Sequence, residues 1–378
     1  MMEYRRLIAL LVLPFSLIVS EAVASDFLAP FLETHWRQDA PFNDFAPVVV
    51  ENPDAEDTYL GRAPCGCVAT AFAQIMRKWS YPTASVSAGT YGCFVDGSSV
   101  SKTMLGGTYA WSSMPLSSSA VSNPSTAQCQ AIGKLMYDVG VASTMSWKSG
   151  GSGTFAAPAA QALRDRFGYA SANSIFMSSS AGTLPAAAQN AIYSSLDAGM
   201  PVAISIKNAS GGGHEVVVDG YGYRSGTRYS HLNCGWNGSD DVWYNLMGES
   251  LTSHAYTTMD EVAYNIHPTV AGDTISGRVL NASGSPVSGA TVTLENSSGT
   301  RRTATTNAKG IYSFRVSSGG TYQVYAVSGS SQSSSRTLSI SRSVNSSVTH
   351  YANYGNVTAY GSCGSQWGVD LSLQQQSA

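Results

Sequence analysis

The chemistry that this chain could perform begins with a cysteine pair. Residues 63–79 read APCGCVATAFAQIMRKW, with Cys67 at the start of an apolar stretch and Cys65 two residues earlier. A thiolate is stabilised at a helix N-terminus, where the potential is positive and backbone N–H groups are free. Cys67 stands where the helix should begin, so it is the stronger candidate nucleophile. A cysteine before an amphipathic helix is also often a packed core thiol, so Cys67 alone decides nothing.

A thiol nucleophile needs a base within hydrogen-bond reach. The chain has six histidines, and the segment SGGGHEVVVDGYGY singles out His214. Three glycines, of which Gly213 is the last, predict a close backbone approach at the start of an apolar strand. A histidine that opens a strand is more often structural, so this choice rests on the glycines. His231, in the segment SHLNCGWNG, is the competing candidate.

A third group should orient the imidazole. The segment SHLNCGWNG offers Asn233 for this role, with Trp236 close enough to shield the pair from water. His231 and Asn233 would lie on one strand face, which keeps His231 in contention as the base. No Cys/His spacing has the ligand repeats of a zinc site. We therefore expect neither a metal nor a cofactor.

The elements that must position these residues follow from periodicity. Apolar residues from Val68 to Trp79 recur with helical spacing, and Pro82 lies just beyond. Similar patterns predict helices over 127–143, 155–170 and 184–200. Strands are predicted over 201–207, 214–223, 229–236 and 242–246. Helices followed by antiparallel strands define an α+β domain, expected over residues 25–268.

The composition changes after residue 271. Short β-branched and aromatic runs alternate with Gly, Ser, Pro and Asn turns, which predicts an all-β, Ig-like sandwich over residues 272–376. The segments ISGRV, PVSGATV and TNAKGIYSF resemble carboxypeptidase-regulatory-like domains, and WGVDLSL (367–373) is the expected last strand. Nothing in this region looks catalytic. A spacer or an adhesion module, binding a surface or another protein, is the expectation.

The bulk composition and the first residues indicate an exported protein. The chain has 378 residues, is only 12% charged and carries a net charge of −3, which argues against nucleic-acid binding. Arg5 and Arg6 precede the apolar run 7–19, and small residues follow at 22–24. This order is typical of a signal peptide over residues 1–24, and the run is too short for a comfortable membrane span. A secreted or periplasmic protein without a membrane span is therefore expected.

The cysteine count leaves two alternatives open. Six cysteines entering an oxidising compartment allow a complete set of disulfides, with 15 possible connectivities. If one cysteine is instead a reactive thiol, at least one other lacks a partner.

Five segments together resemble the streptopain family of secreted cysteine peptidases. They are CGCVATAFAQIMRKWSYP, GGTYAWSSMP, LMYDVGVASTMSW, GGGHEVVVDGYGY and HLNCGWNG, in the family's order, and the similarity runs from about His35 to Leu246. The resemblance implies a papain-like cysteine peptidase fold, with a helical side and an antiparallel sheet. It implies Cys67 as nucleophile, His214 as general base and then acid, and Asn233 as orienter.

The same resemblance extends to two loops around this expected site. WRQDAPFND resembles the segment with the oxyanion-hole glutamine, which places that role on Gln38. SWKSGGSGTFAAP (146–158) resembles the family's substrate-facing loop. Trp236, Cys234 and Gly213 are the residues expected to line the substrate pocket.

The chain departs from the family pattern at two places. Cys234 stands where the family usually has a tryptophan after the orienting asparagine, although Trp236 is retained. A disulfide between Cys65 and Cys234, bracing the nucleophile loop, is one hypothesis. About 10 residues separate Ser25 from the loop at Trp36. We therefore expect no long propeptide, so that either the enzyme emerges active or a separate proteinaceous inhibitor restrains it.

The leading hypothesis is a secreted cysteine endopeptidase that hydrolyses protein or peptide substrates through a thioester acyl-enzyme. One alternative is an acyltransferase or amidase on the same scaffold, since the deacylating nucleophile leaves no motif. The other is a non-catalytic surface or adhesion protein on a retired peptidase fold. The presence of Cys67, His214, Asn233 and Gln38 together argues against the last alternative.

Overall fold

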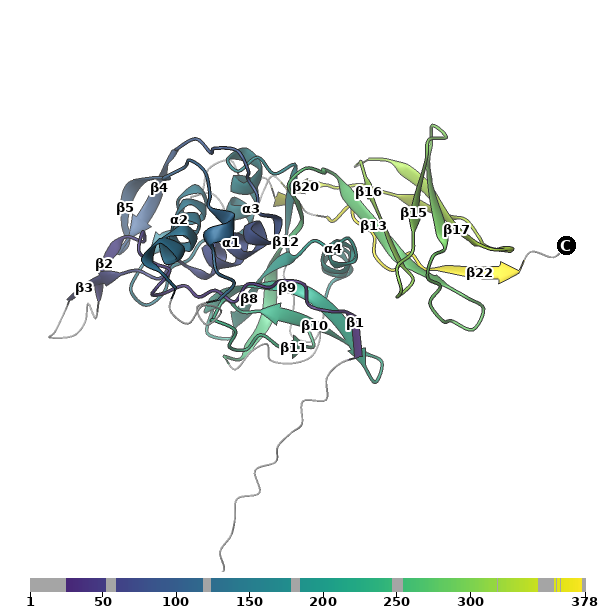
Figure 1. The fold of residues 1–378 in the computed structure, drawn as a ribbon, viewed down its shortest axis with the longest axis horizontal. Coiled ribbons are helices and arrows are strands. Elements are labelled where there is room, and N and C mark those ends of the chain that lie inside the picture. The colour runs from purple at the N-terminus through teal and green to yellow at the C-terminus, as the bar shows by residue number, and fades with distance from the viewer. Residues whose placement is uncertain are drawn as a thin grey trace, which may run out of the picture.

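The computed structural model describes residues 25–51, 59–117, 124–177, 184–246, 254–317, 319–345, 357, 359–360 and 362–375. The expected signal peptide, residues 1–24, lies outside these ranges. Within them, no helix is both long and apolar enough to cross a membrane. Figure 1 shows a mixed α/β part, with helices packed against both faces of a large sheet, followed by a part made of strands alone.

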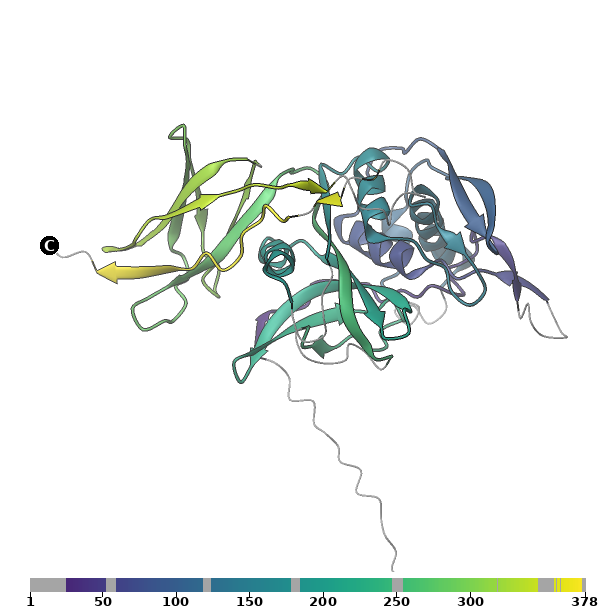
Figure 2. The same cartoon turned by 180° about the vertical axis from the view of Figure 1, so that it is seen from behind.

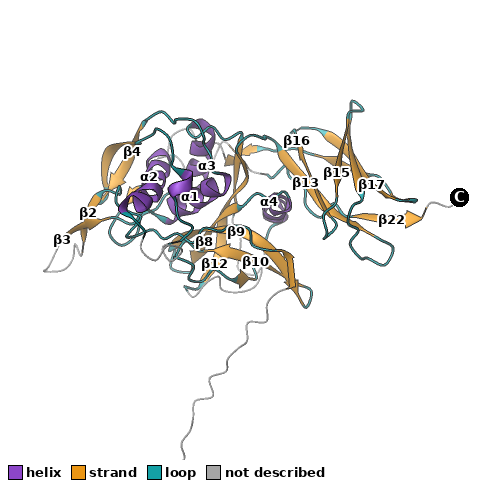
Figure 3. Ribbon diagram, viewed as in Figure 1, coloured by secondary structure: helices purple, strands orange, loops and turns teal. Residues whose placement is uncertain are grey.

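Four α-helices occur where the apolar periodicity predicts them, within about three residues of the expected bounds except that α3 ends five residues before its predicted end. They are α1 (Cys67–Trp79), α2 (Thr126–Ala142), α3 (Ala156–Asp165) and α4 (Ala186–Asp197). Helix α1 buries nearly its whole length, from Val68 to Met76, and ends at Ser80, which adopts a left-handed conformation with φ 47°. Helix α2 begins with a capping box between Ser125 and Gln128. Helix α1 therefore forms the centre of the helical layer, with α2 and α3 around it (Figure 3).

The large sheet has nine strands in the order β11-β10-β9-β8-β12-β7-β21-β20, with β1 added alongside β9. Its strands are β1 (Ser25–Leu28), β7 (Ser171–Phe176), β8 (Val202–Asn208), β9 (Gly213–Arg224), β10 (Thr227–Asn233), β11 (Trp243–Tyr244), β12 (Tyr256–His267), β20 (Val344–Asn345) and β21 (Ala359–Tyr360). The pairs β8–β9 and β9–β10 are antiparallel, as expected, and β8 also pairs antiparallel with β12. Strand β12, which the sequence patterns do not predict, lies at the middle of the sheet.

The two faces of this sheet serve different cores, because successive side chains of a strand point to opposite sides. Ala203, Val217 and Ala263 belong to the core shared with α1, α2 and α3. Val216 and Val262, one residue away, belong to the core shared with α4. The alternation matters for the site, because adjacent residues at the start of β9 must also face opposite ways.

Two small sheets complete the helical side. A hairpin joins β2 (Val48–Glu51) to β3 (Tyr59–Arg62). A second sheet joins β4 (Thr90–Val95), β5 (Ser98–Thr103) and β6 (Ser146–Trp147), and a 3-10 turn covers Trp111–Ser113.

The C-terminal part is all β, as predicted. Its strands follow the order β15-β14-β17-β18-β22-β13-β16, with β19 beside β17. They are β13 (Asp273–Leu280), β14 (Thr291–Asn296), β15 (Arg301–Thr305), β16 (Ile311–Val316), β17 (Thr321–Ser328), β18 (Ser331–Ser333), β19 (Arg336–Ser339) and β22 (Leu371–Gln375). One apolar core, with Ile275, Val292, Val324 and Leu371 fully or almost fully buried, fills the space between them.

The two parts are joined through α4 and a returning segment of the C-terminal region. Helix α4 lies between the large sheet and strands β13 and β16, as both views show (Figures 1 and 2). Tyr360 in β21 pairs in parallel with Ile175 of β7. The Trp367 ring packs on Tyr193 of α4, at 4.9 Å between centroids. Residues late in the sequence therefore contribute to the sheet and the core of the first part.

Candidate active site

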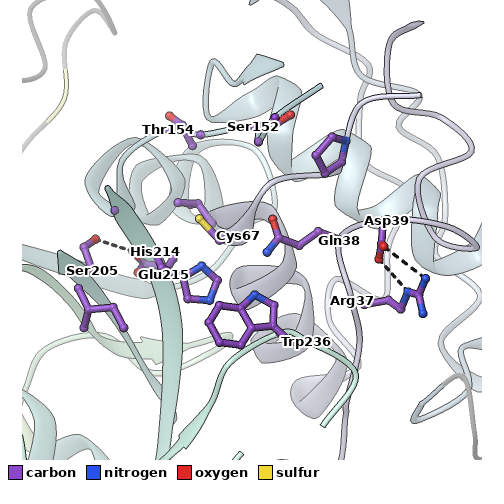
Figure 4. Close-up of a pocket in the computed structure, with 18 of the residues that line it drawn as sticks. Arg37, Gln38, Asp39, Cys67, Ser152, Thr154, Ser205, His214, Glu215 and Trp236 are labelled. Atoms are coloured by element: carbon purple, nitrogen blue, oxygen red, sulfur yellow. Dashed lines mark hydrogen bonds and ion pairs between the residues drawn. The ribbon is translucent and has the colours of Figure 1, made fainter. Parts of the chain in front are cut away.

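A cleft of about 1010 Å³ opens where the helical layer meets the edge of the large sheet. The start of α1, the loop of residues 149–155, the β8–β9 hairpin and the turn of residues 235–237 line it. Figure 4 shows Cys67 and Gln38 on the helical side, with His214, Glu215 and Trp236 facing them from the sheet. The sequence-predicted Cys67, His214, Gln38, Trp236 and Gly213 all lie on this one cleft.

The backbone conformation of Gly66 explains why a glycine stands between the two cysteines. It adopts φ +96°, a conformation that L side chains rarely take, and a Cβ there would lie 2.7 Å from Met145 Cε and 3.0 Å from the Ser152 carbonyl oxygen. As the N-cap residue it offers no side-chain hydrogen bond to the helix. The first backbone N–H groups of α1 are thus left uncapped at the cleft. The sequence pattern placed Cys67 at the helix start but did not identify this role of Gly66.

Burial governs the protonation of Cys67. Burial first, and then the charge of Glu215, raise the pKa of the thiol to about 11, while the backbone N–H groups of Glu215, Val68 and Cys67 itself oppose the rise. Burial therefore works against the thiolate that the sequence predicts at the helix start. A base must take the thiol proton as the sulfur reacts.

His214 is oriented to be that base. Its Nε2 lies 2.8 Å from the carbonyl oxygen of Cys234, which can only accept a hydrogen bond. The neutral ring therefore carries its proton on Nε2 and leaves Nδ1 free to accept one. Burial, as the largest cause, lowers the pKa of His214 to about 4, so the ring is neutral at ordinary pH.

Aromatic rings enclose the imidazole. The Trp236 ring stacks on His214, with centroids 4.5 Å apart and planes 21° apart, and Tyr256 stacks at 5.9 Å. His254 packs edge-on against Trp236 at 4.8 Å. Trp236 thus occupies the shielding position that the sequence predicts for it, while His254 and Tyr256 were not predicted.

Asn233 does not contact the imidazole, which corrects the predicted role of direct orienter. Its side chain is buried and makes three hydrogen bonds: Nδ2 donates to the Thr34 carbonyl at 2.6 Å, and Oδ1 accepts from Gln74 Nε2 at 2.9 Å and from the Gly235 N–H at 3.1 Å. Gln74 is on α1, so Asn233 ties the turn of residues 234–236 to the helix that carries Cys67. The orienting acceptor is the next residue's backbone carbonyl.

Asp241, which the sequence patterns did not single out, holds the backbone N–H of the same residue, Cys234. Asp241 Oδ1 accepts from the Cys234 N–H at 2.7 Å, and its Oδ2 lies 2.7 Å from Nδ1 of His35. The backbone of Cys234 is therefore held at its N–H by Asp241, while its carbonyl holds His214. A backbone acceptor carries no sequence signature, which is why the pattern suggested the nearest amide side chain instead.

Two predicted pocket residues have other roles. The Cys234 side chain is fully buried in the core shared with α4, where its Sγ contacts the Asp240 carbonyl at 3.3 Å, and it does not line the cleft. Gly213 does line the cleft, but a Cβ there would have no neighbour nearer than 3.9 Å, so no close approach requires glycine. Only Gly211, at φ +86°, needs glycine's freedom in this hairpin.

The remaining cysteine and histidine alternatives are resolved in the same way. All six cysteines are free thiols. The hypothesis of a Cys65–Cys234 disulfide is wrong, because Cys65 contacts the Phe42 carbonyl in the helical core and Cys234 lies in the other core. His231 pairs with Asp219 at 2.7 Å and packs on Trp243, away from the cleft. His214 is therefore the histidine of this site.

A cysteine at a helix start, facing a histidine on an antiparallel sheet across a cleft, is the arrangement of the papain-like class of cysteine peptidase fold. The family model of the peptidase C10 family matches residues 36–244, and the carboxypeptidase regulatory-like domain model matches residues 274–351. The chain belongs to the peptidase C10 family, which contains streptopain, as the sequence resemblance predicts.

Known relatives agree with this assignment. The chain is 31% identical over 260 residues to the thiol protease/hemagglutinin PrtT of Porphyromonas gingivalis, covering 64% of this chain and 28% of the relative. It is 30% identical over 220 residues to streptopain of Streptococcus pyogenes, covering 56% of this chain and 53% of streptopain. The chain thus spans about half of streptopain and less than a third of PrtT.

A solved structure supports the fold. Active wild-type interpain A, a cysteine protease of Prevotella intermedia, superposes with a TM-score of 0.51 and 27% identity, covering 63% of this chain and 94% of interpain A. The papain-like architecture of the first part is therefore common to both proteins.

Proposed function

We propose that this protein is an exported cysteine endopeptidase that cleaves peptide bonds through a Cys67 thioester. The observation that carries the proposal is the bond between His214 Nε2 and the Cys234 carbonyl, because it leaves Nδ1 as a free base in the cleft that Cys67 also lines. Family membership supports the reaction class.

In the first half of the proposed reaction, the Cys67 sulfur attacks the substrate carbonyl carbon while its proton passes to His214 Nδ1. The carbonyl π electrons move to oxygen, and the resulting oxyanion is stabilised by the Gln38 amide and the Cys67 backbone N–H. Figure 4 shows the Gln38 side chain extending toward Cys67, as this role requires. The tetrahedral intermediate then collapses, and His214 donates its proton to the departing amine nitrogen.

In the second half, water attacks the thioester carbon and gives a proton to His214. The carbon–sulfur bond breaks, the acid product leaves, and the proton returns to the sulfur. Trp236 and Tyr256 cover faces of the imidazole and limit its access to bulk water. No metal or cofactor enters this scheme.

The decisive experiment is covalent labelling of Cys67 by an epoxysuccinyl inhibitor, combined with release of new N-termini from denatured casein. We expect Cys67→Ala to abolish both, lowering hydrolysis by about 10⁴-fold or more. The matched control is Cys129→Ala, which removes a buried thiol of α2 that does not line the cleft. A Cys67→Ala protein that still cleaves casein would contradict the proposal, provided that a Cys129→Ala control behaves like wild type.

Two further parts of the proposal concern the whole chain. Export rests on the signal-like residues 1–24, and finding intact residues 1–24 on mature protein would contradict it. We also propose two domains, residues 25–268 and 272–376, with the second as a spacer or adhesion module. The packing of Trp367 on Tyr193 favours a fixed rather than a tethered arrangement.

A further inference from the structure

A carboxyl group lies unexplained in the wall of the cleft. Glu215 directly follows His214 on β9, lines the cleft, and is only 2% exposed. Its Oε2 accepts a hydrogen bond from the Ser205 hydroxyl of β8, drawn as a dashed line in Figure 4. Its Oε1 is buried and has no hydrogen-bond partner among the described residues. A buried acceptor left open is costly, so it calls for a partner that the described residues do not supply.

The surroundings of Glu215 are acidic. Asp260 of β12 also lines the cleft; Lys207 pairs with its Oδ2, while its Oδ1 has no hydrogen-bond partner in the described part of the chain. Glu261, fully buried behind them, accepts a hydrogen bond from the Ala157 N–H at the start of α3. Glu215 and Asp260 therefore line this end of the cleft beside the ammonium group of Lys207, with the carboxyl group of Glu261 behind them. The local balance is short of positive charge.

The strand geometry separates this end of the cleft from the imidazole. Ser205 pairs directly with Glu215 across β8–β9, and Ser205 pairs with Glu261 across β8–β12, so all three side chains lie on the face toward the helical layer. His214, one residue away, points to the opposite side and stacks on Trp236. A substrate side chain entering beside Glu215 would thus lie next to the reacting atoms without displacing the Trp236 ring.

We propose that Glu215, assisted by Asp260, forms a subsite that binds a cationic substrate side chain, arginine or lysine, close to the scissile bond. This inference rests on the proposed peptidase function. A guanidinium or ammonium group would supply the missing donor to Oε1 and the missing charge.

The protonation of Glu215 fits this role. Burial first, then the charges of Glu261 and Asp260, raise the pKa of Glu215 well above its ordinary value, against the hydrogen bond from Ser205. The raised pKa favours the neutral carboxyl, and an entering cation would favour the carboxylate instead. A buried carboxylate without a cation is costly, so a bound guanidinium or ammonium group would stabilise the charged form of Glu215.

The test is a fluorogenic peptide library that varies one residue at a time on both sides of the scissile bond. We expect wild type to favour arginine or lysine over norleucine at one position by roughly tenfold or more in kcat/KM. Glu215→Gln removes the charge and keeps the shape and the Ser205 bond, and should bring that ratio to about one. Glu215→Asp keeps the charge one methylene further back and should retain the preference, favouring the longer arginine.

The matched control is Asp165→Asn, which removes an exposed carboxylate at the far end of α3. It should leave the preference unchanged. A wild-type profile without a cationic preference, a preference for glutamine instead, or a cationic preference that persists in Glu215→Gln would each overturn the inference. If wild type neither cleaves any peptide nor reacts with the epoxysuccinyl inhibitor, the proposed function itself fails. Cleavage without a cationic preference would contradict only the proposed subsite and not the proposed peptidase function.

Discussion

Two carboxyl groups in this molecule occupy opposite kinds of environment. Glu215, in the cleft, has one oxygen bonded by Ser205 and the other without a partner among the described residues. Asp197, at the end of α4 where the two parts of the chain meet, accepts from the Tyr221 hydroxyl at 2.7 Å and from the Ser276 hydroxyl of β13 at 2.7 Å. The Trp367 side chain gives a further hydrogen bond to Asp197.

The difference distinguishes polar groups that stabilise the fold from polar groups that remain available to a ligand. At the contact between the two parts of the chain, here called the joint, donors from three segments converge on the Asp197 carboxyl. Its hydrogen bonds are therefore satisfied within the protein. At the cleft, the carboxyl of Glu215, the N–H groups at the uncapped start of α1 and Nδ1 of His214 are left available. An arrangement that leaves buried groups open costs stability, and it is retained where a ligand completes it.

Within this comparison, the largest effect on the reaction rate is expected from displacing the uncapped start of helix α1. Gly66→Ala adds a Cβ at φ +96°, 2.7 Å from Met145 Cε, so the loop before Cys67 must shift. A displacement of about 1 Å at a nucleophile can cost on the order of 10²-fold in rate. We expect a loss of that size in kcat/KM for casein-derived peptides, with secondary structure retained by circular dichroism.

The control for this change is Gly97→Ala in the β4–β5 turn. Gly97 has φ +78° and nothing within 4 Å of an added Cβ, so the substitution introduces a similar backbone strain without a clash and away from the cleft. Activity should stay near the wild-type value. Equal losses in both variants would mean that general destabilisation, rather than displacement of Cys67, explains the Gly66 result.

A pH profile tests the state of the open base. Burial lowers the pKa of His214 to about 4, and the neutral ring is the form that can accept the Cys67 proton. For an uncharged substrate, kcat/KM should therefore be level from about pH 5.5 to 7 and should fall as the pH approaches 4. An acidic limb centred near 6.5, the ordinary histidine value, would show that His214 is more solvated than the structure indicates. Circular dichroism at each pH separates titration from unfolding.

Much of this arrangement follows from the sequence. Apolar spacing fixed the positions of all four helices, because burial of one helix face leaves a period that residues such as Phe72 and Met76 display. The pattern also predicts β8, β9 and β10. It misses β12, whose Asp260, Glu261, Asn265 and His267 mix charge and polarity into a strand at the middle of the sheet. Such a strand is identified by its pairing with neighbouring strands, because its own sequence does not alternate between polar and apolar residues.

The site divides in the same way. The placing of Cys67, His214, Gln38 and Trp236 on one cleft could be predicted, because each proposed role needs a particular side chain. The orienting acceptor could not, since any residue at position 234 offers the same carbonyl, and Asn233 was the nearest suitable side chain. Gly66 and Glu215 were visible in the sequence, but their roles depend on Met145 and Ser205, which approach only in the folded chain.

The smallest expected effect concerns the joint and is a matter of stability rather than of rate. Burial first raises the pKa of Asp197 from 3.8 to about 7, and its hydrogen bonds oppose that rise. The unfolded chain releases this proton above about pH 4 while the native chain retains it until about pH 7. The stabilising contribution of the protonated group is therefore complete below pH 3.8 and is lost as the pH rises to about 7.

Asn at this position cannot titrate, so Asp197→Asn should remove the pH dependence. We expect the difference in Tm, wild type minus Asp197→Asn, to decrease between pH 4 and 7 and to level off above pH 7. The decrease should correspond to a loss of stability on the order of 1 kcal/mol per pH unit. Cleavage of neutral peptides should be unchanged, because Asp197 does not line the cleft. Glu295→Gln, at an exposed ion pair with Arg301, serves as the charge control. A constant difference across this range would mean that Asp197 is ionised at the joint, and that the contrast with Glu215 lies in hydrogen bonding alone.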